Sequence, residues 1–144
     1  MLQATKDIGK WIPKDVAYYL NLDKSGVITS LRYRFKKSPI IYGIRCRPDG
    51  MIYVGSSLAP GLRFHKHLIT GEESNQNLQD AISEHGLGQF TVHIFKVVDF
   101  PAHFNYCSPL WGEKEKKTHL LKLEQEYLDM IPHKRLYNTS KAVK

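Results

Sequence analysis

The hydrophobic positions between residues 40 and 131 follow a strand period in some segments and a helix period in others. Two β-rich runs, at 40–42 and 53–57, bracket a Pro48-Asp49-Gly50 turn, and Asp and Gly tolerate the positive φ angles of tight hairpins. The β-rich segment 90–100 alternates in period two from Phe90 on, which predicts a third strand. Apolar residues at helical spacing predict helices at about 60–68, 75–85 and 113–130. The pattern therefore predicts an α+β fold in which helices flank a three-stranded antiparallel sheet.

Residues 1–38 have the character of an N-terminal basic extension. A proline at position 13 precedes a segment, 14–20, that is compatible with a short helix. Segment 31–37 alternates apolar and basic residues, so a strand there would have one cationic face. Basic side chains between aromatics suit a nucleic-acid backbone and unstacked bases, while a solvated edge strand or a linker fits the pattern equally well. The predicted organisation is an arm at 1–38, a domain at 39–140 and a tail at 141–144.

The predicted hairpin carries two tyrosines and is followed by a basic helix. With a two-residue loop, Asp49-Gly50, the side chains of Tyr42 and Tyr53 point to the same face of the hairpin. A loop one residue longer would need a β-bulge to keep the two phenols together. Arg63 lies just beyond the second strand, so a polar pocket is predicted there that folding alone does not require.

A carboxylate interrupts the apolar stripe of the predicted helix at 113–130. Glu124 lies within the series of leucines that begins at Leu120, and burial of a carboxylate is costly without a partner. A salt bridge to a neighbouring arginine is one explanation, and a bound metal ion is the other. The polar hairpin face favours a functional role for Glu124.

Composition places the chain among single-domain globular proteins with a basic surface. It has 144 residues, of which 42% are hydrophobic and 11% aromatic. The net charge of +7 favours a nucleic-acid partner over a membrane surface, and no apolar run approaches the roughly 20 residues of a membrane span. The two cysteines, Cys46 and Cys107, lack metal-ribbon or disulfide-framework spacing and are interpreted as free thiols.

These residues together resemble the GIY-YIG nuclease family over about residues 38–140. Tyr42 matches the tyrosine of the first motif, and Tyr53-Val54-Gly55 matches the second motif with valine for isoleucine. Ile40 stands where the first motif has a glycine, which departs from the family pattern. The pattern between 77 and 90 is most similar to intron-encoded homing endonucleases of fungal mitochondria, which implies a mitochondrial location. The other residues that carry the resemblance are Arg63, His67, Glu124 and Asn138.

The resemblance implies a catalytic role for each of these positions. Glu124 would hold one divalent ion, Mg²⁺ or Mn²⁺, and Arg63 would face the phosphoryl oxygens. Tyr42 would act as the general base or would orient the attacking water. The supporting roles would fall to Tyr53 in the same pocket, His67 as a proton relay and Asn138 as an orienting group. The predicted nucleic-acid-binding residues are Arg32, Arg34, Lys36, Lys37, Arg45, Arg47 and Lys66.

Two functions from different classes are compatible with the sequence. The first is a metal-dependent DNA endonuclease of the homing type, whose relatives usually carry a separate DNA-binding region. The second is a catalytically silent module that binds nucleic acid, for example RNA in a ribonucleoprotein such as a mitochondrial ribosome. The basic segment and Ile40 fit the second function, whereas retention of the complete set of polar site residues favours the first.

Overall fold

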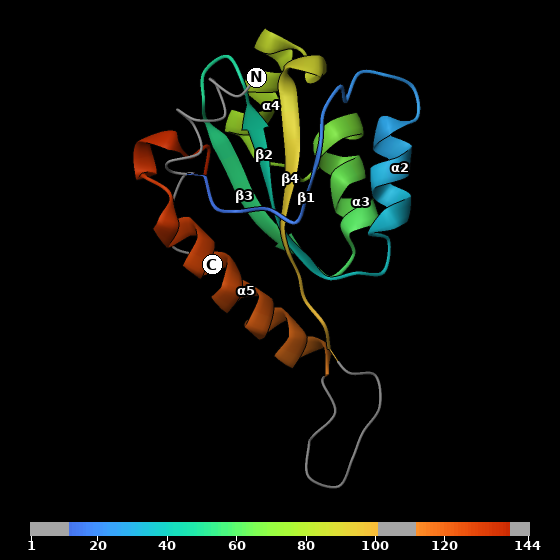
Figure 1. Cartoon of the computed structure of the whole chain (residues 1–144), viewed down its shortest axis with the longest axis vertical. Helices are drawn as coiled ribbons and strands as arrows, with labels where there is room; N and C mark the ends of the chain where they lie inside the picture. The colour runs from blue at the N-terminus through green and yellow to red at the C-terminus, as the bar shows by residue number, and fades with distance from the viewer. Residues whose placement is uncertain (1–11, 101–111, 139–144) are drawn as a thin grey trace, which may run out of the picture.

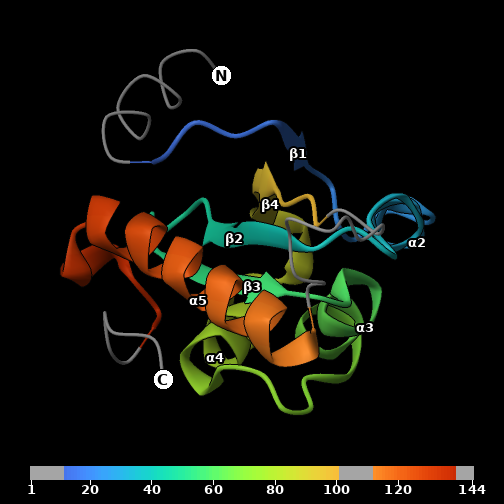
Figure 2. The ribbon, with the colours of Figure 1, turned by 90° about the horizontal axis from the view of Figure 1, so that it is seen from below.

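A computed structural model describes residues 12–100 and 112–138, and its centre is a four-stranded antiparallel sheet. The strands lie in the order β1-β4-β2-β3, so β3 and β1 are the edges (Figures 1 and 2). This mixed α+β architecture confirms the predicted fold class. The strands are β1 (Ala17–Tyr19), β2 (Ile40–Cys46), β3 (Ile52–Ser57) and β4 (Phe90–Val97).

Helices cover both faces of the sheet. Figure 1 shows α2 and α3 together on one side of the sheet, with α5 on the other. None of the helices within the described ranges is long and apolar enough to cross a membrane. The helices are α2 (Val27–Arg34), α3 (Pro60–His65), α4 (Gln76–His85) and α5 (Glu113–Met130), with a π-helical turn η1 (Lys66–Thr70) and two short 3₁₀ turns η2 (Leu87–Gln89) and η3 (His133–Arg135).

Each face of the sheet packs into its own hydrophobic core. Tyr42 and Ile44 of β2 pack with Phe64 of α3 and Leu78 of α4 in the first core. On the opposite face, residues of β2, β3 and β4 pack against Leu120, Leu123 and Leu128 of α5. The alternation of side chains along a strand therefore sends Tyr42 into one layer while its neighbour Ile41 enters the other.

The hairpin between β2 and β3 has a longer loop than the two residues considered above. The Cys46 and Met51 positions are joined by a backbone hydrogen bond of 2.9 Å, which leaves the four residues 47–50 in the loop. Because the pairing shifts by two positions, Tyr42 lies opposite Gly55 and Tyr53 lies opposite Ile44. The two tyrosines therefore remain on one face without a bulge in the β2–β3 pairing.

The N-terminal segment differs from the short helix considered at 14–20 and from the strand considered at 31–37. Residues 17–19 form strand β1 on the free edge of β4, not a helix, and this adds the fourth strand to the predicted three. Residues 27–34 form helix α2, although 31–37 alternates like a strand. Leu31 and Phe35 are buried four residues apart while Tyr33 is 82% exposed, so the helical period decides which side chains enter the core.

A partly buried polar network around His93 links the N-terminal segment to the sheet. The Nδ1 atom of His93 lies 2.7 Å from the Asp15 carboxylate, and Arg45 donates its Nε–H to His93 Nε2 at 3.2 Å. Because Nε2 accepts from Arg45, Nδ1 carries the proton and donates it to Asp15. Burial lowers the pKa of His93, since the ring is 7% exposed.

Removal of the Asp15 carboxylate tests this attachment. We expect Asp15→Ala to lower the free energy of unfolding by about 1–3 kcal/mol, because it leaves the buried His93 Nδ1–H without an acceptor. Urea unfolding at pH 7 gives this difference. Asp99→Ala removes an exposed carboxylate and serves as the control; equal losses in both variants would show that the network does not hold the segment.

Candidate active site at the edge of strand β3

Tyr42 and Tyr53 form the base of the candidate site. Their ring centroids lie 6.4 Å apart, Tyr42 is fully buried and Tyr53 is partly exposed. The backbone of Gly55 passes so close to Tyr42 that a Cβ atom there would lie 2.6 Å from the phenol oxygen. The glycine of the second motif is therefore required here by close approach and not by an unusual φ angle.

His67 lies in the π-helical turn η1, and its ring centroid is 5.8 Å from that of Tyr42 and 5.0 Å from that of Tyr53. Its Nε2 atom is 2.8 Å from the Tyr42 hydroxyl, and its Nδ1 atom is 2.6 Å from Ser74 Oγ. Gln79 donates from Nε2 both to Ser74 Oγ at 2.9 Å and to the His67 carbonyl at 2.8 Å. π-Turns are frequent at functional sites, and this one places a buried imidazole against a buried phenol.

Burial keeps both members of this pair uncharged. The pKa of His67 falls to about 3, first because the ring is desolvated and then because Arg63 is positively charged. The pKa of Tyr42 lies well above its usual value, mainly through burial and through the neighbouring Tyr53. At neutral pH a neutral phenol therefore faces a neutral imidazole.

Arg63 is partly exposed and interacts with both tyrosines. Its guanidinium donates one hydrogen bond to the Glu73 carbonyl at 2.8 Å, which fixes the side chain without neutralising it. Burial lowers its pKa, but interactions with Tyr42 and Tyr53 outweigh this, so the pKa is raised. Lys66, one turn further along, makes its ion pair with the Glu73 carboxylate at 2.6 Å instead.

Glu124 reaches the site from helix α5, on the other side of the sheet. Ser56 of β3 donates its hydroxyl to Glu124 Oε1 at 2.6 Å, and Glu124 makes no ion pair with any described residue. Burial raises the pKa of Glu124, opposed by the Ser56 hydrogen bond and the charge of Arg63. The arginine salt bridge considered from the sequence is therefore absent among the described residues.

This arrangement is chemically suited to a hard divalent cation. Glu124 supplies one desolvated carboxylate, and a bound cation would offset the cost of its burial. Mg²⁺ commonly takes one or two protein carboxylates and keeps several waters for substrate oxygens. The charge of Arg63 lowers the pKa of Tyr42 and that of Glu124 raises it, so both charges lie within electrostatic range of the same phenol.

Asn138 fixes the exposed edge strand at this point. Its side-chain oxygen accepts from Val54 N–H at 3.0 Å, and its amide donates to the Val54 carbonyl at 2.9 Å. Both hydrogen bonds are of the kind that a neighbouring strand would make. Asn138 thus binds the backbone of the second motif at Val54, between Tyr53 and Gly55.

Ile40 is accommodated without displacement of these groups. Its side chain is fully buried in the first core, and the register shift between β2 and β4 falls one residue later, between Ile41 and Tyr42. The departure from the glycine of the first motif therefore fills hydrophobic space behind Tyr42 and leaves the Tyr42–His67 contact intact.

The predicted nucleic-acid-binding residues fall into separate groups. The first comprises the basic residues in and just after α2, where Arg32 donates to the Gly61 carbonyl at 2.8 Å and anchors α2 to α3. Arg45 and Arg47 lie at the far end of β2, engaged by His93 and by the Gly88 and Gln89 carbonyls. The structure therefore does not bring all of these residues together on one patch.

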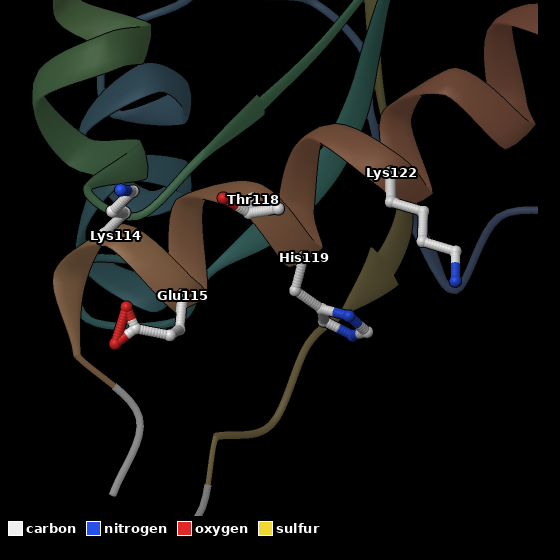
Figure 3. Close-up of a pocket in the computed structure, with 5 residues that line it drawn as sticks. All are labelled: Lys114, Glu115, Thr118, His119 and Lys122. Atoms are coloured by element: carbon white, nitrogen blue, oxygen red, sulfur yellow. The ribbon is translucent and has the colours of Figure 1, made fainter.

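A pocket on helix α5 contains none of the predicted site residues. Figure 3 shows its lining side chains along the first half of the helix, with His119 turned toward the segment that follows β4. The ring of His119 contacts Phe100 at a centroid distance of 5.7 Å. The lining residues are Lys114, Glu115, Thr118, His119 and Lys122.

Three residues of the site did not stand out in the sequence. Ser56 follows the second motif directly, and its position on the face opposite Tyr53 points it at α5, so the strand period was an available signal. Ser74 lies in a loop and Gln79 on a helix, and both meet His67 only through the tertiary fold. No local pattern indicates them.

Comparison with known proteins places the fold in one class. No protein-family model matches the chain, and no curated protein is significantly similar to it. Among solved structures, the fold is similar to the catalytic domain of the intron endonuclease I-TevI, in a mutant form, with a TM-score of 0.53 and 21% identity. The match covers 74% of this chain and 97% of that chain. The fold is that of a GIY-YIG catalytic domain.

A methyl group at Gly55 tests the close approach of Tyr42. We expect Gly55→Ala to lower the free energy of unfolding by about 1–3 kcal/mol, because the buried phenol has to move. Gly61→Ala is the matched control, since its Cβ would make ordinary contacts from 3.5 Å and would favour helix α3 by up to about 1 kcal/mol. Urea unfolding measures both; a Gly55→Ala variant as stable as the parent would contradict the packing described here.

The neutral state of His67 predicts an acid-sensitive stability. Below about pH 6.5 the unfolded chain takes up a proton that folded His67 does not accept until its pKa of about 3. The free energy of unfolding should therefore decrease as the pH is lowered below about 6.5. The contribution of His67 to this decrease is up to about 1.4 kcal/mol per pH unit. In His67→Gln this part of the slope disappears while the contribution of His93 remains. Denaturant unfolding at pH 7, 6 and 5 measures the slopes, and equal slopes in the two proteins would show that His67 is not held neutral.

Proposed function

We propose that the protein is a metal-dependent endonuclease that hydrolyses phosphodiester bonds in DNA. The observation that carries this is the convergence of two layers at the β3 edge: the tyrosines and Arg63 from one side, and Glu124 from the other. A structural core has no need of a desolvated carboxylate near a guanidinium, a buried phenol and a second, partly exposed phenol. Similarity of the fold to an endonuclease catalytic domain supports the same reaction class.

Glu124 is the residue that would hold the cation, which we assign as Mg²⁺ or Mn²⁺. The ion would supply charge stabilisation at the phosphoryl group and the leaving oxygen. Ser56 donates its hydroxyl to Oε1 at 2.6 Å, and a carboxylate has further lone pairs that can bind a cation.

Arg63 is suited to bind the transferred phosphoryl group. Its raised pKa keeps it cationic, and its five N–H donors outnumber its contacts with the Glu73 carbonyl and the hydroxyls of Tyr42 and Tyr53. A guanidinium matches two phosphate oxygens at once and stabilises the charge that grows on them in the transition state. Its attachment to a backbone carbonyl reduces the reorganisation required during the reaction.

Tyr42 and His67 form the proposed proton path from the attacking water. A phenol with a raised pKa is a weak source of phenolate, so Tyr42 accepts a proton from water only as its own passes to His67 Nε2. The positive charge of Arg63 opposes this transfer in the free protein. A bound phosphate offsets that charge and raises the proton affinity of His67, which couples the relay to substrate binding.

Nicking of supercoiled plasmid tests this proposal. With Mg²⁺ or Mn²⁺ the parent protein should nick the plasmid, and EDTA should abolish the activity. We expect Glu124→Gln and Arg63→Ala each to slow nicking by about 10²–10³-fold, because each removes charge stabilisation of the transition state. Glu126→Gln changes an exposed carboxylate two residues away and should leave the rate unchanged.

The same experiment separates the alternative function. A folded parent protein that binds DNA or RNA but nicks neither with any divalent ion would identify a catalytically silent binding module. Nicking that survives Glu124→Gln at the parental rate would exclude the proposed metal ligand while leaving a nuclease.

A further inference from the structure

A second cluster of metal-binding side chains lies at the turn end of the β2–β3 hairpin. The ligand atoms of Cys46, Asp49 and His85 all lie within 4.8 Å of one another. Cys46 ends β2, Asp49 lies in the hairpin loop and His85 ends helix α4. The three residues therefore come from separate elements that the fold brings together. The cluster shares no residue with the proposed active site.

The distances suit a tetrahedral ion after small side-chain movements. Ligand atoms around Zn²⁺ are separated by about 3.3–3.7 Å when the bonds to N, O and S have their usual lengths. His85 Nε2 already lies 3.8 Å from Asp49 Oδ2, and their side chains are 23% and 31% exposed, so both have room to close on an ion. Cys46 is fully buried and would be the fixed, innermost ligand.

The neighbouring groups support Asp49 as a ligand. Asp49 Oδ1 accepts the Met51 N–H at 2.8 Å, and Oδ2 accepts the Tyr137 hydroxyl at 2.8 Å. Each carboxylate oxygen has two lone-pair positions, so one on Oδ2 remains for a cation while Tyr137 orients the group. Glu84 Oε2 lies 3.1 Å from His85 Nε2 and is the nearest candidate for a fourth ligand.

We infer that Cys46, Asp49 and His85 form a binding site for a thiophilic divalent cation, Zn²⁺ in particular. A cysteine sulfur and an imidazole nitrogen select Zn²⁺ over Mg²⁺, which prefers oxygen ligands. The site is therefore distinct in chemistry from the single carboxylate of Glu124. Cys46, interpreted from the sequence as a free thiol, becomes a ligand because the fold supplies partners from residues 49 and 85.

A bound ion would link the hairpin turn, the end of α4 and the C-terminal segment. An ion there joins the hairpin turn to the end of α4, and the Tyr137 hydroxyl links the C-terminal segment to the same carboxylate. Tyr137 precedes Asn138, whose side chain holds Val54 in the second motif. A bound ion would therefore stabilise the backbone that supports the active site without taking part in the chemistry.

Cobalt(II) provides a direct test on the full chain. The protein is stripped with EDTA, kept reduced with a phosphine and titrated with Co²⁺ in excess Mg²⁺. We expect one Co²⁺ per chain, a thiolate-to-metal charge-transfer band, and displacement by one equivalent of Zn²⁺. Cys46→Ser should lose the band and Cys107→Ser, the matched control, should keep it. Absence of the band in the parent, or its persistence in Cys46→Ser, would overturn the assignment.

A second variant keeps the test decisive if Cys46→Ser does not fold. His85→Asn changes a partly exposed ligand and should weaken Co²⁺ binding at least tenfold. Added Zn²⁺ should raise the melting temperature of the parent and of Cys107→Ser but have little effect on His85→Asn. An equal rise in all three proteins would overturn the site. None of these readouts depends on nuclease activity, so failure here leaves the proposed function untouched.

Discussion

The close approach between the Tyr42 hydroxyl and the backbone of Gly55 is the constraint on which the site depends. A phenol can lie against a strand in this way only where the neighbouring residue has no Cβ, so the glycine fixes where Tyr42 points. Its hydroxyl then lies within 2.8 Å of His67, which ties the β2–β3 register to the position of η1. A one-residue slip of the hairpin would move Tyr42 to the α5 face and break every part of this arrangement.

Desolvation gives the site its electrostatic character. Burial makes the charged forms of Tyr42, His67 and Glu124 unfavourable, while Arg63 stays cationic beside them. A cation at Glu124 and a phosphate at Arg63 would each offset one of these penalties. The ligands of the proposed reaction would therefore relieve the energetic cost of burying these groups.

Sequence period predicted the hairpin, the third strand, helix α5 and the place of Glu124, because each depends on a local pattern. The prediction for the N-terminal segment was wrong because its structure depends on contacts with distant residues. Strand β1 forms by pairing with the free edge of β4. The spacing of Leu31 and Phe35 fits both a strand and a helix, and only their burial in the core distinguishes the two. Ser74 and Gln79 were missed for the same reason. The likeness to fungal mitochondrial enzymes, and the location that it implies, stay predictions.

The net charge of +7 overstates how much cationic surface is available to a polyanion. Arg45 donates a hydrogen bond to His93, and the pKa of Arg45 is lowered, first by burial and then by the charge of Arg47. Its guanidinium is therefore less available to an external polyanion. Arg47 donates to two backbone carbonyls at the same end. The exposed Lys36 and Lys37 lie just after α2, which packs beside α3, the helix that carries Arg63. A DNA backbone held at Arg63, as proposed, would find additional positive charge along α2, which favours this side of the molecule over the hairpin end for phosphate contacts.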